Sequence, residues 1–209
     1  MKPLTFYTNP NSRGRIIRWM LEELNQPYHV ELMHFGGNIK SAEFLALNPM
    51  GKVPAIKHGD TVVTEGAAIC AYLADQFADK GLAPAPDRPE RGTYYRWLFF
   101  AAGPLEMATT AKAYNWRLDS DNCTSVGCGL YNDTLNTLET ALANGPYLCG
   151  EQFTAADVYV GSHISWGMLF GTLEKRPAFT DYVHRLQARK AYSRATELDD
   201  ALAKTMEHQ

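Results

Sequence analysis

The stretch that decides the fold class lies near the start of the chain: Leu4-Thr5-Phe6-Tyr7-Thr8-Asn9-Pro10-Asn11-Ser12-Arg13-Gly14-Arg15-Ile16-Ile17-Arg18-Trp19. Residues 4–8 form a short apolar run that is typical of a β-strand, and residues 16–24 carry apolar side chains at helical spacing. The polar residues between them indicate a tight turn. Three arginines fall near the start of the expected helix, although a helix N-terminus carries partial positive charge and favours anions. Either these cations extend into water or this end of the protein holds a negative group.

The residues that follow extend this pattern into a small α/β domain. Its further elements are expected to be a strand at 28–33, a short helix at 41–47, a β-hairpin at 53–64 and a helix at 67–77. The order is β-α-β-(α)-β-β-α, and the first three elements suit a parallel strand pair with a right-handed crossover.

The rest of the chain differs in composition and in its pattern of apolar residues. Residues 79–89 are rich in Pro, Gly and charge and indicate a linker. Beyond them the pattern is almost entirely helical, and the expected helices are about 90–118, 125–143, 155–170, 178–188 and 191–203. Gly103-Pro104 should kink the first of these. The sequence therefore predicts an α/β domain over residues 1–78, a linker over 79–89 and an all-α domain over 90–209.

Composition limits the classes of function. The chain has 209 residues, 45% of them hydrophobic, and a formal net charge of −3. This charge argues against broad electrostatic binding to nucleic acid. No apolar run approaches the roughly 18 residues that a membrane-spanning helix needs, and the first residues lack the pattern of a signal peptide. We therefore expect a cytoplasmic protein without nucleic-acid or membrane partners.

The four cysteines argue against a metal centre. Cys70, Cys123, Cys128 and Cys149 form no Cys-x-x-Cys pair and have no histidine cluster beside them. Zinc sites and dithiol redox centres use such spacings. We expect no metal site, and reduced thiols with a structural role.

Four stretches, taken in order, carry a resemblance to a known family. They are the opening strand, turn and helix with Ser12, then Met50-Gly51-Lys52-Val53-Pro54-Ala55, then Thr64-Glu65-Gly66-Ala67-Ala68-Ile69-Cys70-Ala71-Tyr72-Leu73, and finally Tyr147-Leu148-Cys149-Gly150 with Phe153-Thr154-Ala155-Ala156-Asp157-Val158. Each is weak alone, but the ordered set, with its linker and length, resembles a cytosolic glutathione S-transferase of bacterial type.

The resemblance implies a fold and an activity. The fold is an α/β thioredoxin-like N-terminal domain that binds glutathione, followed by an all-α C-terminal domain. The activity is conjugation of reduced glutathione, as co-substrate, to a small hydrophobic electrophile, as in detoxification, by a homodimer. Thr154-Ala155-Ala156-Asp157 is a capping box before an apolar helix, and the family carries it as a folding element.

The expected glutathione-binding residues lie in the second and third stretches. The resemblance implies a cis bond between Val53 and Pro54 that turns the Val53 backbone toward the cysteinyl part of glutathione. From the residues alone, Pro54 is simply an edge-strand proline. Lys52 is a candidate for the glycyl carboxylate, as is, more weakly, Lys40. Both lysines can equally be solvated.

Glu65 and Gly66 suit the γ-glutamyl end of glutathione, which is a zwitterion. Glu65 would bind the ammonium and the helix N–H groups the carboxylate; alternatively, Glu65 merely caps the helix. The family usually has Ser or Thr after the Glu, whereas Gly66 offers only its N–H. The missing hydrogen bond corresponds to about 0.5–1.5 kcal/mol, so modest affinity is expected unless another donor compensates.

Two hydroxyls are candidates for activating the thiol. A cysteine thiol has a pKa of about 8.5, and lowering it by about two units needs roughly 2.7 kcal/mol of preferential thiolate stabilisation. Ser12 stands just before the helix, as in serine-type members, and Tyr7 ends the first strand, as in tyrosine-type members. We favour Ser12, because the alternation of the strand can turn Tyr7 away from the site. The competing interpretations are an N-cap for Ser12 and core packing for Tyr7.

The other turn residues receive smaller roles. Arg13 would help to hold the thiolate, or would face solvent, and Asn11 is a further donor. Arg15 and Arg18 are by default surface charges, with Glu22 four residues after Arg18 as an ion-pair partner. The turn contains no cysteine, which disfavours thioltransferase-type members.

The helical domain should wall off an apolar pocket for the electrophile, with Met107, Tyr114 and Trp116 as candidates. At helical spacing such residues are more often core. The aromatic residues 94–100 indicate buried packing or a dimer surface.

Other functions remain open. A non-catalytic glutathione-binding or ligand-binding scaffold shares the fold. A glutathione-dependent isomerase or dehalogenase shares the thiolate. A disulfide reductase fits poorly, because no cysteine lies at the turn. The electrophile is not readable from the sequence.

Overall fold

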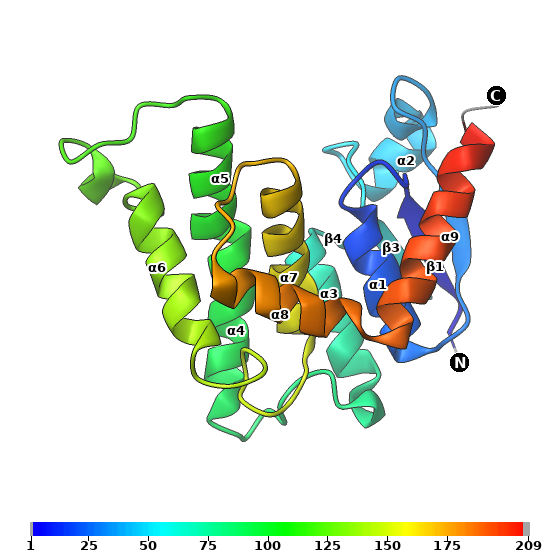
Figure 1. The fold of residues 1–209 in the computed structure, drawn as a ribbon. Coiled ribbons are helices and arrows are strands. Elements are labelled where there is room, and N and C mark those ends of the chain that lie inside the picture. Colours follow the sequence, from blue (N-terminus) through cyan, green and yellow to red (C-terminus); the bar gives the residue numbers. More distant parts are fainter. Residues whose placement is uncertain (1, 207–209) are drawn as a thin grey trace. The chain divides into compact units, whose positions relative to one another are not determined.

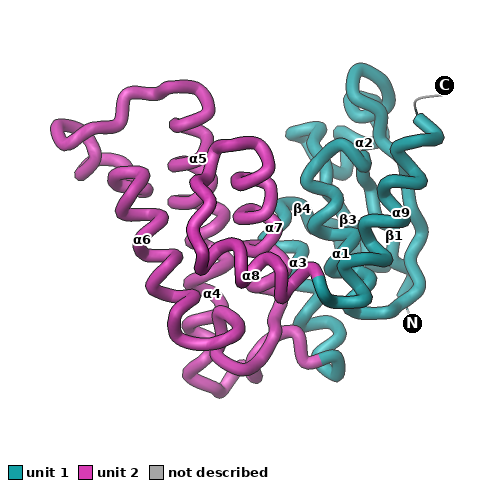
Figure 2. Tube along the Cα trace, in the orientation of Figure 1, with its two compact units in different colours: residues 1–80, 188–209 teal, residues 81–187 magenta. Residues whose placement is uncertain are grey.

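The computed structural model describes residues 2–206, which form two compact units (Figure 2). Of the described residues, unit 1 comprises 2–80 together with 188–206, and unit 2 comprises 81–187. The expected boundaries differ from these units near the C-terminus, because residues 188–206 group with the α/β unit and not with the helical one. Ion pairs with the first helix, described below, explain this grouping.

Within the described residues, unit 1 is built on a four-stranded mixed sheet with strand order β2-β1-β3-β4, in which Figure 1 labels β1, β3 and β4. The strands are β1 (Leu4–Thr8), β2 (His29–Leu32), β3 (Ala55–His58) and β4 (Thr61–Thr64). β1 pairs in parallel with β2 and antiparallel with β3, and β3 pairs antiparallel with β4. The expected order of strands and the hairpin are confirmed.

Capping residues mark the ends of helices in unit 1. They are α1 (Gly14–Leu24), α2 (Ala42–Leu47), α3 (Gly66–Gln76) and α9 (Lys190–Met206), with short 3₁₀ turns at Asn38–Lys40 and Ala78–Lys80. α1 ends at Asn25, whose left-handed φ of 50° closes the helix. The Ser41 hydroxyl caps α2 by accepting the Phe44 N–H at 3.2 Å.

The two faces of the sheet bury different sets of side chains. Phe6 on β1 and Ile56 on β3 are fully buried and lie on the face of the sheet that α1 covers. On that face the guanidinium of Arg18 in α1 lies 5.2 Å from the Phe6 ring centroid. Tyr7 alternates to the opposite face, where its ring lies 5.6 Å from that of Phe44 in α2. The strand period of two therefore separates the α1 face from the α2 face.

The regular elements of unit 2 are helices, apart from isolated β-bridges between Tyr147 and Gly150 and between Cys149 and Gln152. Its helices are α4 (Glu90–Phe100), α5 (Glu106–Ala113), α6 (Tyr131–Leu142), α7 (Ala155–Leu169) and α8 (Pro177–Gln187), and a π-helical segment, Ala101–Leu105, joins α4 to α5. The π-helical segment contains Pro104, which has no N–H to donate and interrupts the regular ladder. The helix expected over 90–118 thus ends at Ala113, and the one expected from 125 begins at Tyr131. No helix within residues 2–206 has the length and apolarity to cross a bilayer.

The capping box at the start of α7 is confirmed, and its aspartate does more than cap. The buried Asp157 carboxylate accepts the Thr154 N–H at 2.8 Å, the Leu148 N–H at 2.9 Å and the Tyr182 hydroxyl at 2.7 Å. Asp157 therefore ties the start of α7 to α8 and to the preceding loop, as a folding element would.

Candidate functional site

The peptide bond between Val53 and Pro54 is cis, as the resemblance implied. Pro54 is buried, and Val53 is half-buried against a cluster that includes Met33 and Phe44. Within the described chain, no backbone hydrogen bond occupies the N–H or the C=O of Val53. A donor and an acceptor of one residue are thus available together, as at the edge of a sheet, and can pair with an extended peptide.

Asn48 holds the loop before the cis bond, a role that the sequence reasoning missed. Its side chain is buried, donates to the Lys52 carbonyl oxygen at 2.8 Å and accepts the Met50 N–H at 3.1 Å. Lys40 supports the same loop by donating to the Met50 carbonyl oxygen at 2.9 Å. This contact gives Lys40 a structural role, whereas Lys52 is exposed. The segment Asn48-Pro49-Met50-Gly51 was the only signal for this loop in the sequence.

Glu65 adopts an unusual backbone conformation directly before α3. Its φ is 66° and its ψ is 120°, a combination that a non-glycine residue adopts at a cost of about 1–3 kcal/mol. The side chain is exposed and makes no capping hydrogen bond to α3. Glu65 therefore occupies the N-cap position of α3, but its side chain does not cap the helix. Strain of this kind persists where the surrounding structure enforces it, and it clusters at functional sites.

The Ser12 hydroxyl is engaged on both sides. It donates to the Asn9 carbonyl oxygen at 2.6 Å and accepts the Gly14 N–H at 2.9 Å. The N-cap position of α1 is occupied by Arg13, whose side chain makes no capping bond. Ser12 is half-buried, and the Gly14 N–H polarises its hydroxyl toward donation. The cap-like contact with Gly14 therefore coexists with a donor whose present acceptor is a backbone carbonyl.

The turn that carries Ser12 is fixed to the sheet by Asn9. The buried Asn9 amide donates to the Met33 carbonyl oxygen at 2.7 Å, and its side-chain oxygen accepts the Asn11 N–H at 2.9 Å. Asn11 itself is exposed. The turn is thus a defined structure at its base, and its exposed residues Asn11 and Arg13 lie on either side of Ser12 in the sequence.

Thr8 and Gly14 approach each other closely beneath this turn. Thr8 is fully buried, and its hydroxyl has no hydrogen-bond partner among the described residues. A Cβ placed on Gly14 would lie 2.0 Å from the Thr8 Oγ1. Only glycine fits at position 14, so the first residue of α1 is set by packing against β1.

Tyr7 has its ring in the apolar cluster on the α2 face, against Phe44. Burial, followed by the nearby Glu31 carboxylate, raises the pKa of Tyr7 above its usual value. The phenol is therefore protonated at physiological pH and able to donate. The core-packing interpretation of Tyr7 is confirmed for its ring.

Arg15 and Arg18 are not the surface charges expected from the sequence. Arg18 is 4% exposed and its guanidinium Nε donates to the Asp199 carboxylate on α9 at 3.0 Å. It also donates to the Tyr28 hydroxyl at 2.9 Å, and Glu22, its expected partner, pairs instead with Arg194. Arg15 contacts the turn and α9 together. The cations at the start of α1 thus have partners within unit 1.

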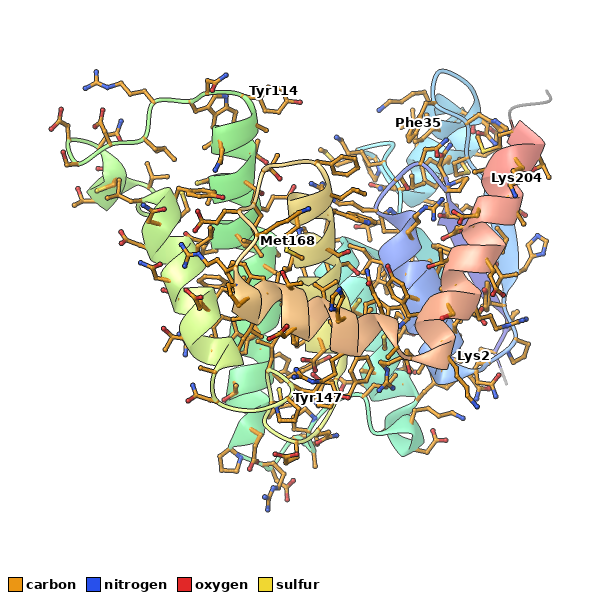
Figure 3. The ribbon with its side chains drawn as sticks, in the orientation of Figure 1. Lys2, Phe35, Tyr114, Tyr147, Met168 and Lys204 are labelled. Carbon is orange, nitrogen blue, oxygen red and sulfur yellow. The ribbon has the colours of Figure 1, made fainter. Side chains whose placement is uncertain are left out.

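The electrophile candidates lie in unit 2 and are exposed. The exposed fractions are 40% for Met107, 72% for Tyr114 and 57% for Trp116. The Tyr114 and Trp116 rings stack with centroids 6.5 Å apart, and Figure 3 shows Tyr114 at the end of α5. The alternative that these residues form the core is wrong. Leu169 and Phe170, both 73% exposed at the end of α7, add apolar surface that the sequence reasoning did not identify.

The cysteines are all free. Burial raises the pKa of the Cys149 thiol to about 11 and that of Cys70 further, so neither is a reactive thiolate at neutral pH. Among residues 2–206, no group of three or more His, Cys, Asp or Glu side chains is arranged to hold a metal ion.

Comparison with protein families matches two models to this chain. The model described as the glutathione S-transferase N-terminal domain matches residues 12–76, and the one described as the glutathione S-transferase C-terminal domain matches residues 127–192. Glutathione S-transferase A of Pleuronectes platessa is 32% identical over 180 residues, which cover 81% of this chain and 80% of that relative.

Solved structures show the same similarity over nearly the whole chain. A glutathione transferase from Methylococcus capsulatus is 28% identical with a TM-score of 0.79, and the match covers 95% of this chain and 99% of that one. The glutathione transferase URE2P6 from Phanerochaete chrysosporium, solved in complex with oxidized glutathione, is 25% identical with a TM-score of 0.77 and covers 96% and 97% of the two chains.

Proposed function

Since the chain belongs to the glutathione S-transferase family of enzymes, we propose that unit 1 binds reduced glutathione and stabilises its thiolate for attack on a small hydrophobic electrophile. The observation that carries the proposal is the Val53 peptide group beside the cis bond, whose N–H and C=O lack backbone partners within residues 2–206. These two groups match the backbone of the cysteinyl residue and would place its sulfur near β1.

The two ends of glutathione would be held by charge. The exposed Glu65 carboxylate binds the γ-glutamyl ammonium, and its strained backbone presents that carboxylate directly before α3. The N–H groups at the start of α3, including that of Gly66, bind the γ-glutamyl carboxylate. Lys52 binds the glycyl carboxylate, because it is exposed and precedes Val53 in the sequence.

Ser12 is proposed as the donor that stabilises the thiolate. When sulfur arrives, the Ser12 O–H leaves the Asn9 carbonyl oxygen and donates to sulfur, while the Gly14 N–H continues to polarise it. A hydrogen bond to a charged acceptor contributes about 1.5–3 kcal/mol, close to the roughly 2.7 kcal/mol that a shift of about two pKa units requires. The thiol proton passes to solvent, so no general base is needed.

Neighbouring groups complete the thiolate site. Arg13 adds positive charge and Asn11 a further donor, and both are exposed beside Ser12 in the turn. Tyr7 is the second candidate donor, because its raised pKa keeps the hydroxyl protonated. Ser12 and Tyr7 are therefore the two candidate donors, and the Ser12 hydroxyl is already hydrogen-bonded within the turn.

The thiolate sulfur donates an electron pair to an electrophilic carbon and forms a bond to it. In a substitution, the electron pair of the broken bond departs with the leaving group. In an addition to a double bond, the displaced electron pair takes a proton from water. The exposed apolar side chains Met107, Tyr114 and Trp116 of unit 2 favour a hydrophobic electrophile. Glutathione-dependent isomerisation and dehalogenation use the same thiolate, so assays with substrates of these reactions should accompany the conjugation assays.

We also propose that the protein acts as a homodimer in the cytoplasm. On α4, Phe99 is 74% exposed and Tyr95 is 41% exposed, and exposed aromatic residues of this kind are typical of interfaces. The free cysteines suit a reducing compartment. Analytical ultracentrifugation of the native chain and of Phe99→Glu tests the dimer, which the substitution should weaken.

Calorimetry and turnover together test the proposed function. Reduced glutathione and S-methyl glutathione, which lacks a thiol, should both bind with a stoichiometry of one per chain. A panel of halogenated aromatics, unsaturated carbonyls and haloalkanes should show conjugation only with reduced glutathione. Absence of binding would overturn the glutathione proposal, and binding without turnover would favour a scaffold.

A further inference from the structure

Arg15 joins the proposed thiol-activating turn to the last helix of the chain. Its Nε donates to the Pro10 carbonyl oxygen at 2.6 Å, and its Nη1 lies 2.8 Å from the Asp200 carboxylate on α9. Pro10 lies between Asn9 and Ser12 in the turn. One planar guanidinium thus holds the turn on one side and α9 on the other, which a flexible ammonium could not do with the same geometry.

Arg15 adds a contact to the turn at the Pro10 carbonyl oxygen, a group that Asn9 does not bind. Asn9 fastens the base of the turn through the Met33 carbonyl. The Pro10 carbonyl is the next polar group along the chain, and Arg15 supplies its donor from the first turn of α1. The backbone N–H of Arg15 also donates to the Ser12 carbonyl oxygen, with a nitrogen-to-oxygen distance of 3.3 Å. Arg15 therefore contacts the turn immediately before and at Ser12.

α9 can support this contact because it packs against α1 (Figure 1). The Arg18–Asp199 pair is buried, with 4% and 1% of the side chains exposed. A buried pair fixes the relative position of its two helices, since displacement would leave a charge unpaired. Asp200 follows Asp199 directly, so its carboxylate is presented to Arg15 at a defined place.

Three further contacts extend the attachment of α9 toward the end of α1. Arg194 on α9 pairs with Glu22 at 2.8 Å, and Arg189, which directly precedes α9, pairs with Glu23 at 2.7 Å. The Trp19 and Tyr192 rings meet edge to face, with centroids 5.1 Å apart. The Arg15–Asp200 pair is therefore one of several α1–α9 contacts, and it is the one that also contacts the turn.

The pair itself contributes little stability. Its side chains are 29% and 52% exposed, and ion pairs this accessible typically contribute about 0–1 kcal/mol. Its effect is expected on geometry, since a hydrogen-bonding hydroxyl displaced by about 1 Å loses much of its effect on a reacting atom.

We propose that Arg15 is a positioning residue for the Ser12 turn and that Asp200 on α9 holds Arg15 in place. The inference rests on the proposed function of Ser12. It makes the C-terminal helix part of the construction of the thiol site, although α9 is separated from that turn by most of the sequence. Neither Arg15 nor Asp200 needs to touch glutathione.

The test compares Arg15→Lys and Asp200→Asn with Arg194→Gln, a matched control that removes an α1–α9 ion pair away from the turn. All three should melt close to the native protein. Arg15→Lys should raise the pKa of the thiol of bound glutathione and lower kcat several-fold, with little change in the glutathione KM. Asp200→Asn should have the same effects, but weaker. Asp200→Glu should restore native values, and Arg194→Gln should leave them unchanged.

Hydrogen exchange in the protein without glutathione separates this proposal from the proposed function. Arg15→Lys should accelerate exchange of the amides of Asn11 and Gly14, and Arg194→Gln should not. Accelerated exchange without any thiolate signal in the native protein would overturn the role of Ser12 and keep the positioning role of Arg15. Equal exchange and equal kcat in Arg15→Lys and Arg194→Gln would overturn the positioning role.

Discussion

The Ser12 hydroxyl donates to the Asn9 carbonyl oxygen at 2.6 Å while it accepts the Gly14 N–H at 2.9 Å. In this state the only proton of the hydroxyl is already in use. Thiolate stabilisation by Ser12 therefore requires an exchange of acceptors, and the charged sulfur has the advantage because charge-assisted hydrogen bonds are about twice as strong as neutral ones. The orientation of one hydroxyl separates the resting site from the active one.

Glu65 should show a conflict between stability and binding. Glu65→Gly should raise the melting temperature, because glycine tolerates a φ of 66° and removes strain of about 1–3 kcal/mol. Glu65→Gln keeps the strained backbone and should leave the melting temperature unchanged. Both variants should weaken glutathione binding in calorimetry by about tenfold or more, since a hydrogen bond to a charged group is lost. Unchanged affinity in Glu65→Gln would remove Glu65 from the site.

Gly66 offers the opposite experiment, a gain of affinity. Gly66→Ser adds a hydroxyl at the first position of α3, where it can donate to the γ-glutamyl carboxylate. One additional hydrogen bond of about 0.5–1.5 kcal/mol should tighten glutathione binding roughly twofold to tenfold. Gly66→Ala is the matched control, because it adds the Cβ without the hydroxyl. Equal affinities of the two variants would contradict the expected contact.

Gly14 should tolerate no side chain while Thr8 is present. Gly14→Ala places a Cβ 2.0 Å from the Thr8 Oγ1, and such overpacking typically costs about 1–3 kcal/mol. Chemical denaturation should show this loss for Gly14→Ala. The double variant Thr8→Ala/Gly14→Ala should recover part of it, because the clashing hydroxyl is gone. Additive losses in the double variant would show that the two residues do not act on each other.

His58 should make the stability of the protein depend on pH. Burial, and then the positive charge of Lys2, lowers the pKa of His58 below its usual value of 6.5. Above pH 6.5 both the folded and the unfolded chain hold a neutral imidazole. As the pH falls below 6.5, the unfolded chain takes up the proton first, so the free energy of unfolding decreases until the pH passes the folded pKa.

Denaturation curves between about pH 7.5 and pH 5 measure this dependence. His58→Gln should flatten the decrease, although it also loses the contact with the Tyr72 hydroxyl at 3.1 Å. An unchanged slope in His58→Gln would assign the pH dependence to other groups.

Local patterns were enough to predict most of the fold. The period of two over residues 4–8 and the helical spacing from Ile16 correctly predicted β1 and α1, and Ser41 correctly began α2. The errors occurred where distant residues decide. α9 joins unit 1 through pairs such as Arg18–Asp199, whose members are 181 residues apart, and no local pattern contains that information.

The candidate site divides in the same way. Val53, Pro54 and Glu65 were identified because the ordered motifs resemble a family. The engagement of Ser12 with Asn9 was not predictable, since it depends on the exact turn conformation. Arg15 was predicted to be a surface charge because its partner, Asp200, lies near the other end of the sequence.

The central claim is that the Ser12 hydroxyl stabilises the thiolate of bound glutathione. The most direct test is titration of the thiolate by ultraviolet absorbance in the glutathione complexes of the native protein, Ser12→Ala and Tyr7→Phe. The account predicts a bound thiol pKa about two units below the free value of about 8.5 in the native protein and in Tyr7→Phe, and a return to about 8.5 in Ser12→Ala. A lowered pKa that persists in Ser12→Ala and is lost in Tyr7→Phe would contradict the account and assign the role to Tyr7.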